Sequence, residues 1–263
     1  MKSDTPRDSW LTAPVAFFLL LAALLATWAL VEPATLIRNF DRSGYSPFEL
    51  ATIPVFAAIV PLVWWKCPFG GSVTRRRLLC AAVSLVAVMA IVKELDLHIA
   101  LLRWLYPDYI TADGVMAPGV LFRADGSPRA GTPFKMPVLK AAAVPLGMKA
   151  CIVAYFSAFF GVFAAGFAYL ARTWVKGVFR LEAASWSFGC FCGSGVLAQV
   201  ADRLPAWLGH AHGLRKAGED GVVSSAASLC TALEEGGEMM LALFALLTIL
   251  LAWRAGRNPS RGA

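Results

Sequence analysis

Long, clustered runs of apolar residues constrain this chain more than any other feature of its sequence. Its 263 residues are 58% hydrophobic and only 16% charged, against about 45–50% apolar and about 25% charged residues in soluble domains. Several runs approach or exceed the ~20 residues that cross the hydrocarbon core of a bilayer. The sequence therefore predicts one integral membrane domain over 1–263, all-α, with no soluble domain of any size.

Six runs predict the transmembrane helices of a polytopic bundle. Two prolines lie inside the second run, where membrane helices tolerate them by kinking. The longest polar segment between the runs is 107–137, which we expect to be an extracytoplasmic loop. The expected spans are 11–31, 48–65, 78–102, 149–171, 181–201 and 228–253.

The net charge of +7 is better explained by membrane topology than by nucleic-acid binding. Lys and Arg flank the apolar runs, as the positive-inside bias requires, and no basic patch is interleaved with aromatic residues. Basic residues in the short connections 66–77 and 172–180 favour a multi-pass topology with both termini in the cytoplasm. The expected partners are the lipid bilayer and a membrane or periplasmic protein, but not nucleic acid; the oligomeric state is left open.

Six cysteines are present, and all but Cys67 lie inside expected spans. Cys190-Phe-Cys192 is a C-x-C pattern, not the C-x-x-C of redox or zinc sites. We therefore expect the cysteines to behave as small buried apolar residues.

Ionisable residues gather at one depth of the expected bundle. Each of three carboxylates lies 16 or 17 residues from the basic residue at the far end of its span, which is roughly 25 Å at ~1.5 Å per residue. A second group lies about one turn further out. The first layer is Glu49, Glu94 and Glu238, and the second is His98, Asp202 and Glu234. Because the core is roughly 30 Å thick, the pattern predicts a polar pocket in the outer leaflet.

Spacing within two of the spans also favours a shared site. Glu94 and His98 are four residues apart and are expected to share a helix face, and so are Glu234 and Glu238. Gly236-Gly237 lies between the second pair, where missing side chains let another helix or a ligand approach. A further small-xxx-small spacing, at Gly189 and Gly193, predicts close helix packing.

Inserting one charge at this depth costs about 3 kcal/mol. Three explanations are open for the charges found there. The first is a divalent metal held by Glu94, His98, Glu234 and Glu238, as in helix-bundle metal sites. The second is a proton or ion pathway, in which burial and mutual repulsion raise carboxylate pKa values. The third is structural, with Lys93 neutralised by Asp96 and with Lys93 and Arg203 pairing with the acids.

The candidate residues follow from these explanations. A hydrolase would use one carboxylate as general base for a metal-bound water, and its catalytic candidates are Glu94, Asp96, His98 and Glu238. His210 and His212 lie in an expected loop over 202–227 and are weaker ligand candidates. Other residues expected to line the polar pocket are Glu49, Lys93, Gln199, Asp202, Arg203 and Glu235.

Two segments carry a resemblance to known proteins. Lys93-Glu94-Leu95-Asp96-Leu97-His98 and Glu234-Glu235-Gly236-Gly237-Glu238 resemble a group of uncharacterised bacterial polytopic inner-membrane proteins, which have a basic-Glu-x-Asp-x-His motif and an acidic last span. The resemblance implies a bundle of about six helices in the bacterial inner membrane and brings no activity. Alkaline ceramidase-like membrane hydrolases use a His-x3-His zinc motif, and this chain departs from them because it has Glu94-x3-His98 instead.

The sequence thus predicts an integral inner-membrane protein with an outer-leaflet carboxylate and histidine pocket and a structural or assembly role. One alternative is a metal-dependent membrane hydrolase acting on a lipid-like substrate. Another is a proton- or ion-coupled transporter. Whether the protein is an enzyme is left open, and a divalent metal is the cofactor that the residue types would suit.

Overall fold

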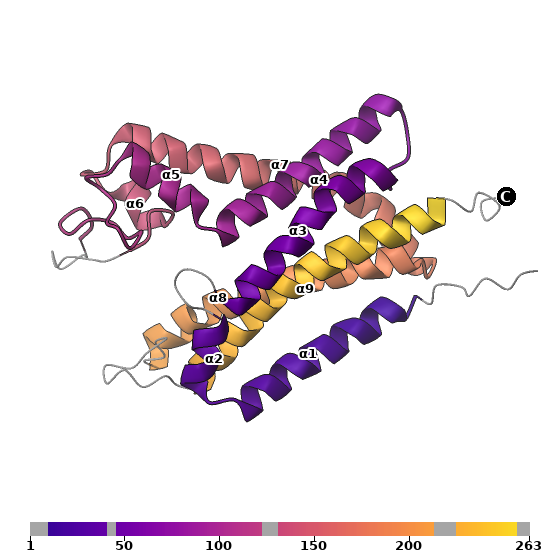
Figure 1. Ribbon diagram of the computed structural model, residues 1–263, viewed down its shortest axis with the longest axis horizontal. Coiled ribbons are helices and arrows are strands. Elements are labelled where there is room, and N and C mark those ends of the chain that lie inside the picture. The colour runs from indigo at the N-terminus through magenta and orange to yellow at the C-terminus, as the bar shows by residue number, and fades with distance from the viewer. Residues whose placement is uncertain (1–9, 41–45, 123–130, 213–224, 257–263) are drawn as a thin grey trace, which may run out of the picture. The chain divides into compact units, whose positions relative to one another are not determined.

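The computed structural model describes residues 10–40, 46–122, 131–212 and 225–256 (Figure 1). This part of the chain is all-helical and contains no strand, which confirms the predicted fold class. The helices are α1 (Thr12–Leu30), α2 (Pro33–Phe40), α3 (Pro47–Lys66), α4 (Val73–Glu94), α5 (Leu97–Leu105), α6 (Met136–Lys140), α7 (Leu146–Phe179), α8 (Ala183–His212) and α9 (Ser225–Gly256).

Three stretches of helix in the described residues are long and apolar enough to cross a membrane: Thr12–Leu30, Leu146–Ala164 and Ser225–Ala255. Helices α4 and α5 pass the same test only together, and they are bent by 73° at the break between them. The count is therefore three candidate spans, or up to four, and the six expected from the sequence are not confirmed. The apolar part of α3 is shorter, and small and polar residues lower the hydropathy of α8.

Contacts divide the chain into two compact units. Unit 1 is residues 1–88 and 168–263, and unit 2 is residues 89–167. Both boundaries fall inside helices, α4 and α7. Each unit carries at least one candidate span, which is compatible with a membrane protein.

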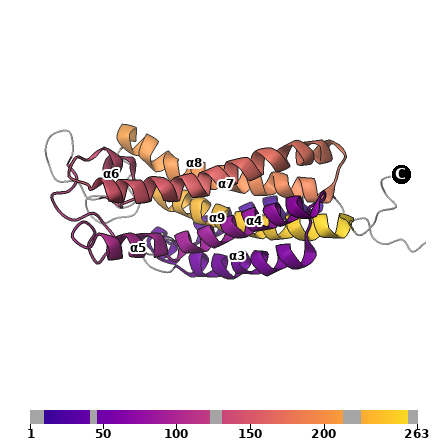
Figure 2. The same cartoon turned by 90° about the horizontal axis from the view of Figure 1, so that it is seen from above.

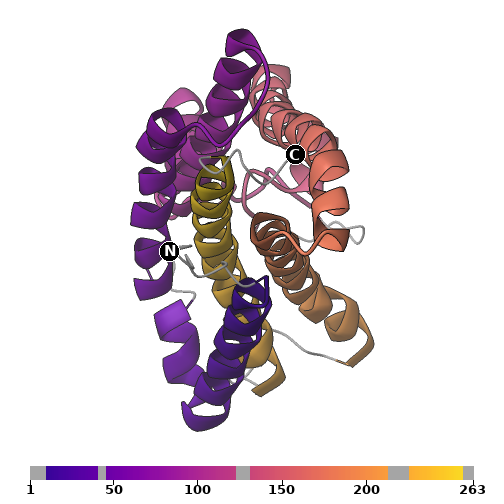
Figure 3. The ribbon, with the colours of Figure 1, turned by 90° about the vertical axis from the view of Figure 1, so that its right-hand side faces the viewer.

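Helix α9 is the centre of unit 1 and contacts α1, α2, α3 and α8 (Figure 3). Its pairing with α8 is antiparallel. At one end, the Ser187 hydroxyl donates to the Phe244 carbonyl (3.3 Å) and the Thr248 hydroxyl donates to Ser187 (3.0 Å). At the other end, Gly237 lies against the backbone of Ala198. The number of residues from Ser187 to Ala198 on α8 equals the number from Gly237 to Thr248 on α9. The two helices therefore stay in register between these contacts.

Two further contacts fix the directions of α1 and α3 beside α9. Phe17 packs on Phe244 with ring centroids 6.0 Å apart, whereas Leu24 lies against Gly236, so α1 runs antiparallel to α9. The Lys66 Nζ atom lies 4.2 Å from the centroid of the Trp253 ring. The C-terminal ends of α3 and α9 therefore meet at one end of unit 1.

Unit 2 contains a folded cap where the sequence predicts a loop. Residues 106–122 and 131–145 have a hydrophobic core of their own, which they share with α5 and the first turns of α7. It contains Leu102, Ile110, Met116, Leu121, Val138, Val144, Met148 and Ile152. An antiparallel bridge joins Ile110 to Met116, and the Arg103 guanidinium donates to the Ala112 carbonyl (2.6 Å). Figure 2 shows α5, α6 and the start of α7 gathered at one end of the unit.

Candidate functional site

The stretch 93–98 holds a break in the helix, not one continuous span. Helix α4 ends at Glu94, and Asp96 adopts the left-handed conformation (φ 50°) before α5 begins at Leu97. The Asp96 amide donates to the Lys93 carbonyl (3.0 Å) and no longer to that of Val92, as a continuous helix would require. The expected span 78–102 is therefore not one continuous helix. The shared helix face of Glu94 and His98 is wrong, because four-residue spacing aligns side chains only in an unbroken helix.

His98 spans this break. Its Nδ1 atom lies 3.4 Å from the Val92 carbonyl oxygen, so the Nδ1–H tautomer donates to the acceptor that the break leaves vacant. The imidazole stacks on Tyr155 of α7 at 5.2 Å and 11°, and its centroid lies 4.6 Å from that of Phe134. His98 thus connects α5 to α4, to the cap and to α7. We name Lys93, Glu94, Asp96, His98, Phe134 and Tyr155 the break site.

The sequence did not indicate Phe134 or Tyr155 as site residues. They lie 36 and 57 residues after His98, and neither has a spacing that relates it to the stretch 93–98. The one available signal is the position of Tyr155, an amphipathic residue in an otherwise apolar run.

The charges at the break include one ion pair between neighbouring residues. The Lys93 ammonium forms a salt bridge with the Glu94 carboxylate at 3.3 Å, as the structural explanation allows, whereas neutralisation of Lys93 by Asp96 stays a prediction. The Glu94 side chain is only 6% exposed and that of Lys93 is 50% exposed. Asp96 is exposed. The carboxylate that carries a buried charge at the break is therefore Glu94.

The acidic segment of α9 behaves as predicted. Glu234, Glu235 and Glu238 lie on one unbroken helix and are all half-buried. A Cβ atom on Gly236 would lie 2.5 Å from a methyl carbon of Leu24 in α1, and one on Gly237 would lie 3.1 Å from the Ala198 backbone nitrogen in α8. The two glycines therefore let two neighbouring helices approach, as expected. Because consecutive helical residues are ~100° apart, Glu238 points away from α1.

The other glycine pair does not act in this way. A Cβ atom on Gly189 would meet nothing within 4 Å, and one on Gly193 would meet only the Phe17 ring at 3.7 Å, an ordinary van der Waals distance. On α8, the tighter approach is at Gly195, 3.2 Å from Leu241. Close packing of α8 against α9 thus depends on Gly195 and Gly237 and not on the small-xxx-small pair.

Within unit 1, the acidic residues of each predicted layer lie at similar levels along the helix axes; the full layers, which include Glu94 and His98 of unit 2, stay a prediction. Counting back from the Lys66–Trp253 contact, Glu49 is 17 residues away on α3 and Glu238 is 15 residues away on α9. Their backbones therefore lie within about 3 Å of the same level at ~1.5 Å per residue. The antiparallel register of α8 and α9 likewise places Asp202 level with Glu234.

Three polar residues of α8 lie outside the interface with α9. Ala198 and Ala201 are buried, whereas Gln199, Asp202 and Arg203 between and beside them are exposed. Asp202 and Arg203 pair with each other at 3.4 Å, with side chains 46% and 65% exposed. These three residues were expected to line the pocket, and the structure places them on the exposed side of α8.

No metal centre forms within either unit among the described residues, since no three His, Cys, Asp or Glu side chains there could hold one ion. Two of the four predicted ligands, Glu94 and His98, belong to unit 2, and the other two, Glu234 and Glu238, belong to unit 1. The four-ligand metal site stays a prediction. The segment around His210 is the end of α8 and not the expected loop.

Comparisons with protein-family models, with curated proteins and with solved structures find no match to this chain. The resemblance to bacterial inner-membrane proteins stays a prediction.

Proposed function

We propose that the protein is a multi-pass membrane protein with an assembly role, in which the break site fixes a folded cap to a membrane anchor. In this proposal the chain lies in the bacterial inner membrane with both termini in the cytoplasm, and the cap faces a periplasmic or membrane partner. The observation that carries the proposal is His98, whose ring bonds to the last turn of α4 and packs between the cap and α7.

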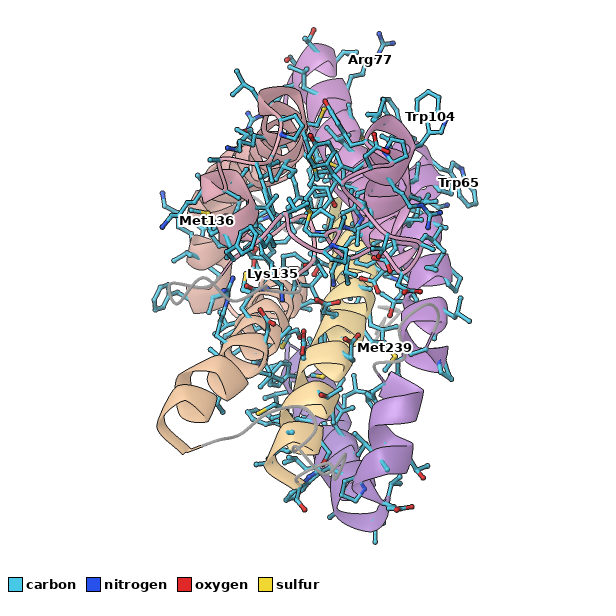
Figure 4. All side chains as sticks on the ribbon, turned by 90° about the vertical axis from the view of Figure 1, so that its left-hand side faces the viewer. Trp65, Arg77, Trp104, Lys135, Met136 and Met239 are labelled. Carbon is cyan, nitrogen blue, oxygen red and sulfur yellow. The ribbon has the colours of Figure 1, made fainter. Side chains whose placement is uncertain are left out.

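The surface of α5 supports a position of the cap at the membrane boundary. Leu97, Leu101 and Trp104 are 48%, 58% and 76% exposed, and their spacing of four and three residues places them on one face of α5. Leu102, on another face, is buried in the core of the cap. The Trp104 ring projects outward (Figure 4). An apolar helix face ending in tryptophan is typical of the interface between lipid and water.

The length of α4 agrees with this position. Its 22 residues extend about 33 Å, which is enough to cross a core roughly 30 Å thick without α5. The 73° bend then turns α5 away from the direction of α4 and toward the plane of the membrane. Lys93, Glu94 and Asp96 would lie where headgroups and water reduce the cost of charge.

The transporter alternative receives less support from the helices that carry the acids. Between Glu238 and Arg254 of α9, the sole hydroxyl is that of Thr248, whose oxygen lies within hydrogen-bond distance of the Phe244 carbonyl and of the Ser187 hydroxyl. A proton relay through the membrane needs a chain of titratable or hydrated groups, and the described part of α9 offers none toward its C-terminal end.

A metal-dependent hydrolase acting on a lipid-like substrate is the second candidate. One observation favours it: unit 2 holds the buried Glu94 side chain and the half-buried, stacked His98 and Tyr155, and it also carries the exposed apolar face of α5, on which a lipid would lie. In that case Glu94 and His98 would serve as ligands, and a metal-bound water would attack the substrate.

A pair of His98 variants separates the two candidates. In detergent-purified protein, we expect His98→Ala to lower the free energy of unfolding by about 2–3 kcal/mol, because the stacked ring and its cavity are lost. We expect His98→Phe to lower it by only about 1 kcal/mol, because the ring contacts remain and one hydrogen bond is lost. Leu97→Ala, on the exposed face of α5, is the matched control.

Thermal unfolding, limited proteolysis of 106–145 and metal content by plasma mass spectrometry are measured on the same samples. An assembly role predicts that the cap becomes cleavable in His98→Ala and stays protected in His98→Phe. Near-stoichiometric metal in the wild type, lost in both variants without any change in stability, would overturn this role and establish the metal-dependent enzyme instead.

A further inference from the structure

Two cysteines of unit 1 lie side by side at the turn between α3 and α4. The Cys67 and Cys80 sulfur atoms are 3.8 Å apart, and the Cys80 thiol also lies 3.4 Å from the Val63 carbonyl oxygen, to which it donates. Cys80 is 2% exposed within a small core that includes Val63 and Phe69. The sequence predicted small buried apolar cysteines and gave no sign of this pair, because Cys67 and Cys80 are thirteen residues apart with a turn between them.

Both sulfur-bearing residues line a hollow that a small molecule can enter. It has a volume of about 240 Å³ and is lined by Trp64, Cys67, Val73, Arg76, Arg77 and Cys80. Cys67 is half-buried and Cys80 is buried, so a reagent entering from the surface meets Cys67 first. The pair therefore combines proximity with unequal access, which is the arrangement of an attacking and a resolving thiol.

We propose that Cys67 and Cys80 form a redox-active dithiol that a peroxide oxidises reversibly to a disulfide. The Cys67 sulfur, as thiolate, attacks one oxygen of hydrogen peroxide, the O–O bond breaks, and the departing hydroxide takes up a proton to leave as water. The resulting sulfenic acid is attacked by the Cys80 sulfur, the S–O bond breaks, and a second water leaves. In sum, two thiols and one peroxide give one disulfide and two waters.

Closing the bond requires the sulfur atoms to move from 3.8 Å to about 2.05 Å. Cys67 is placed to supply this movement, because it follows the last residue of α3 and is not held in a helix. Its φ of 28° lies in the left-handed region, which few non-glycine residues adopt. The disulfide would tie the C-terminal end of α3 to α4.

Thiol counting on the full chain tests the proposal. The purified protein in lipid nanodiscs is treated with hydrogen peroxide, denatured, and labelled with a maleimide polyethylene glycol that adds one mass step per free thiol. We expect the wild type to drop from six labels to four, to recover six with dithiothreitol, and to yield a cross-linked Cys67–Cys80 peptide by mass spectrometry.

The matched controls are Cys67→Ser and Cys190→Ser. Cys67→Ser should show no reversible loss of two labels, whereas Cys190→Ser should show the same loss as the wild type, from five labels to three. Two results would overturn the proposal: Cys67 and Cys80 both remaining labelled after oxidation, or a loss that dithiothreitol does not reverse. Because the peptide is identified in the wild type, the test does not depend on the folding of a variant.

Discussion

The break site and the acidic segment of α9 begin from the same sequence pattern and end in opposite structures. Each has a carboxylate and a second ionisable residue four positions later, Glu94 with His98 and Glu234 with Glu238. In α9 the helix is continuous through Gly236-Gly237. At Asp96, where no glycine or proline is present, the helix ends and turns by 73°.

The comparison shows that packing, not local propensity, determines where these helices break. Glycine is among the poorest helix formers, yet the two glycines of α9 are held helical because α1 and α8 lie directly against them. At the break the contacts favour interruption of the helix. His98 can hydrogen-bond to the Val92 carbonyl and stack on Tyr155 only if α5 turns away from the axis of α4. Helical stability in proteins comes mostly from such packing.

The largest expected effect comes from placing a large side chain at Gly237, where α9 lies close to α8. Gly237→Leu should lower the free energy of unfolding by about 3 kcal/mol, because its side chain would meet the backbone of Ala198 and force α8 and α9 apart. Thermal unfolding in detergent, followed by circular dichroism, measures the change.

Gly189→Leu is the matched control on α8. A side chain there meets nothing within 4 Å, and leucine is a better helix former than glycine, so stability should stay the same or rise by up to about 1 kcal/mol. Equal losses at the two positions would contradict the view that α9 stays continuous because its glycines are packed.

Much of unit 1 could be predicted from hydropathy alone. The expected spans 11–31 and 228–253 correspond to α1 and α9 within three residues at each end, because apolar runs of this length have few other stable structures in a membrane. The number of spans was less predictable. Helix α8 has the expected start but extends to His212, since polar residues near its end remain helical where a loop was expected.

The candidate site was predictable where it depends on spacing along one helix, and not where it depends on contacts between residues far apart in the chain. The position that Glu49 and Glu238 share along the helix axes follows from residue counts in the sequence and from the rise per helical residue. The break does not, because it depends on Phe134 and Tyr155, far from His98 in the chain. The folded cap was missed for the same reason: its core joins residues from 102 to 152.

A smaller effect is expected at the residue that turns the chain at the break. Asp96 has a positive φ of 50°, a conformation that costs a β-branched residue about 1–2 kcal/mol. Asp96→Val should lower the free energy of unfolding by about that amount, whereas Asp96→Gly should leave it unchanged or raise it by up to about 1 kcal/mol. Chemical unfolding in mixed micelles measures both. A gain from Asp96→Val would mean that α4 and α5 prefer to form one straight helix.

The smallest expected effects come from removing the charge of one buried and one exposed carboxylate. Glu94 is 6% exposed and paired with Lys93, so Glu94→Gln should lower the free energy of unfolding by about 1 kcal/mol. Asp202 also forms a salt bridge with its sequence neighbour, Arg203, but both side chains are well exposed. Asp202→Asn should therefore change the free energy of unfolding by less than about 0.5 kcal/mol. Raising the salt concentration should weaken the contribution of the Asp202 pair more than that of the Glu94 pair, because screening acts most strongly on exposed charges. If Asp202→Asn proves the more damaging change, the stabilising charges of this protein lie on α8 and not at the break.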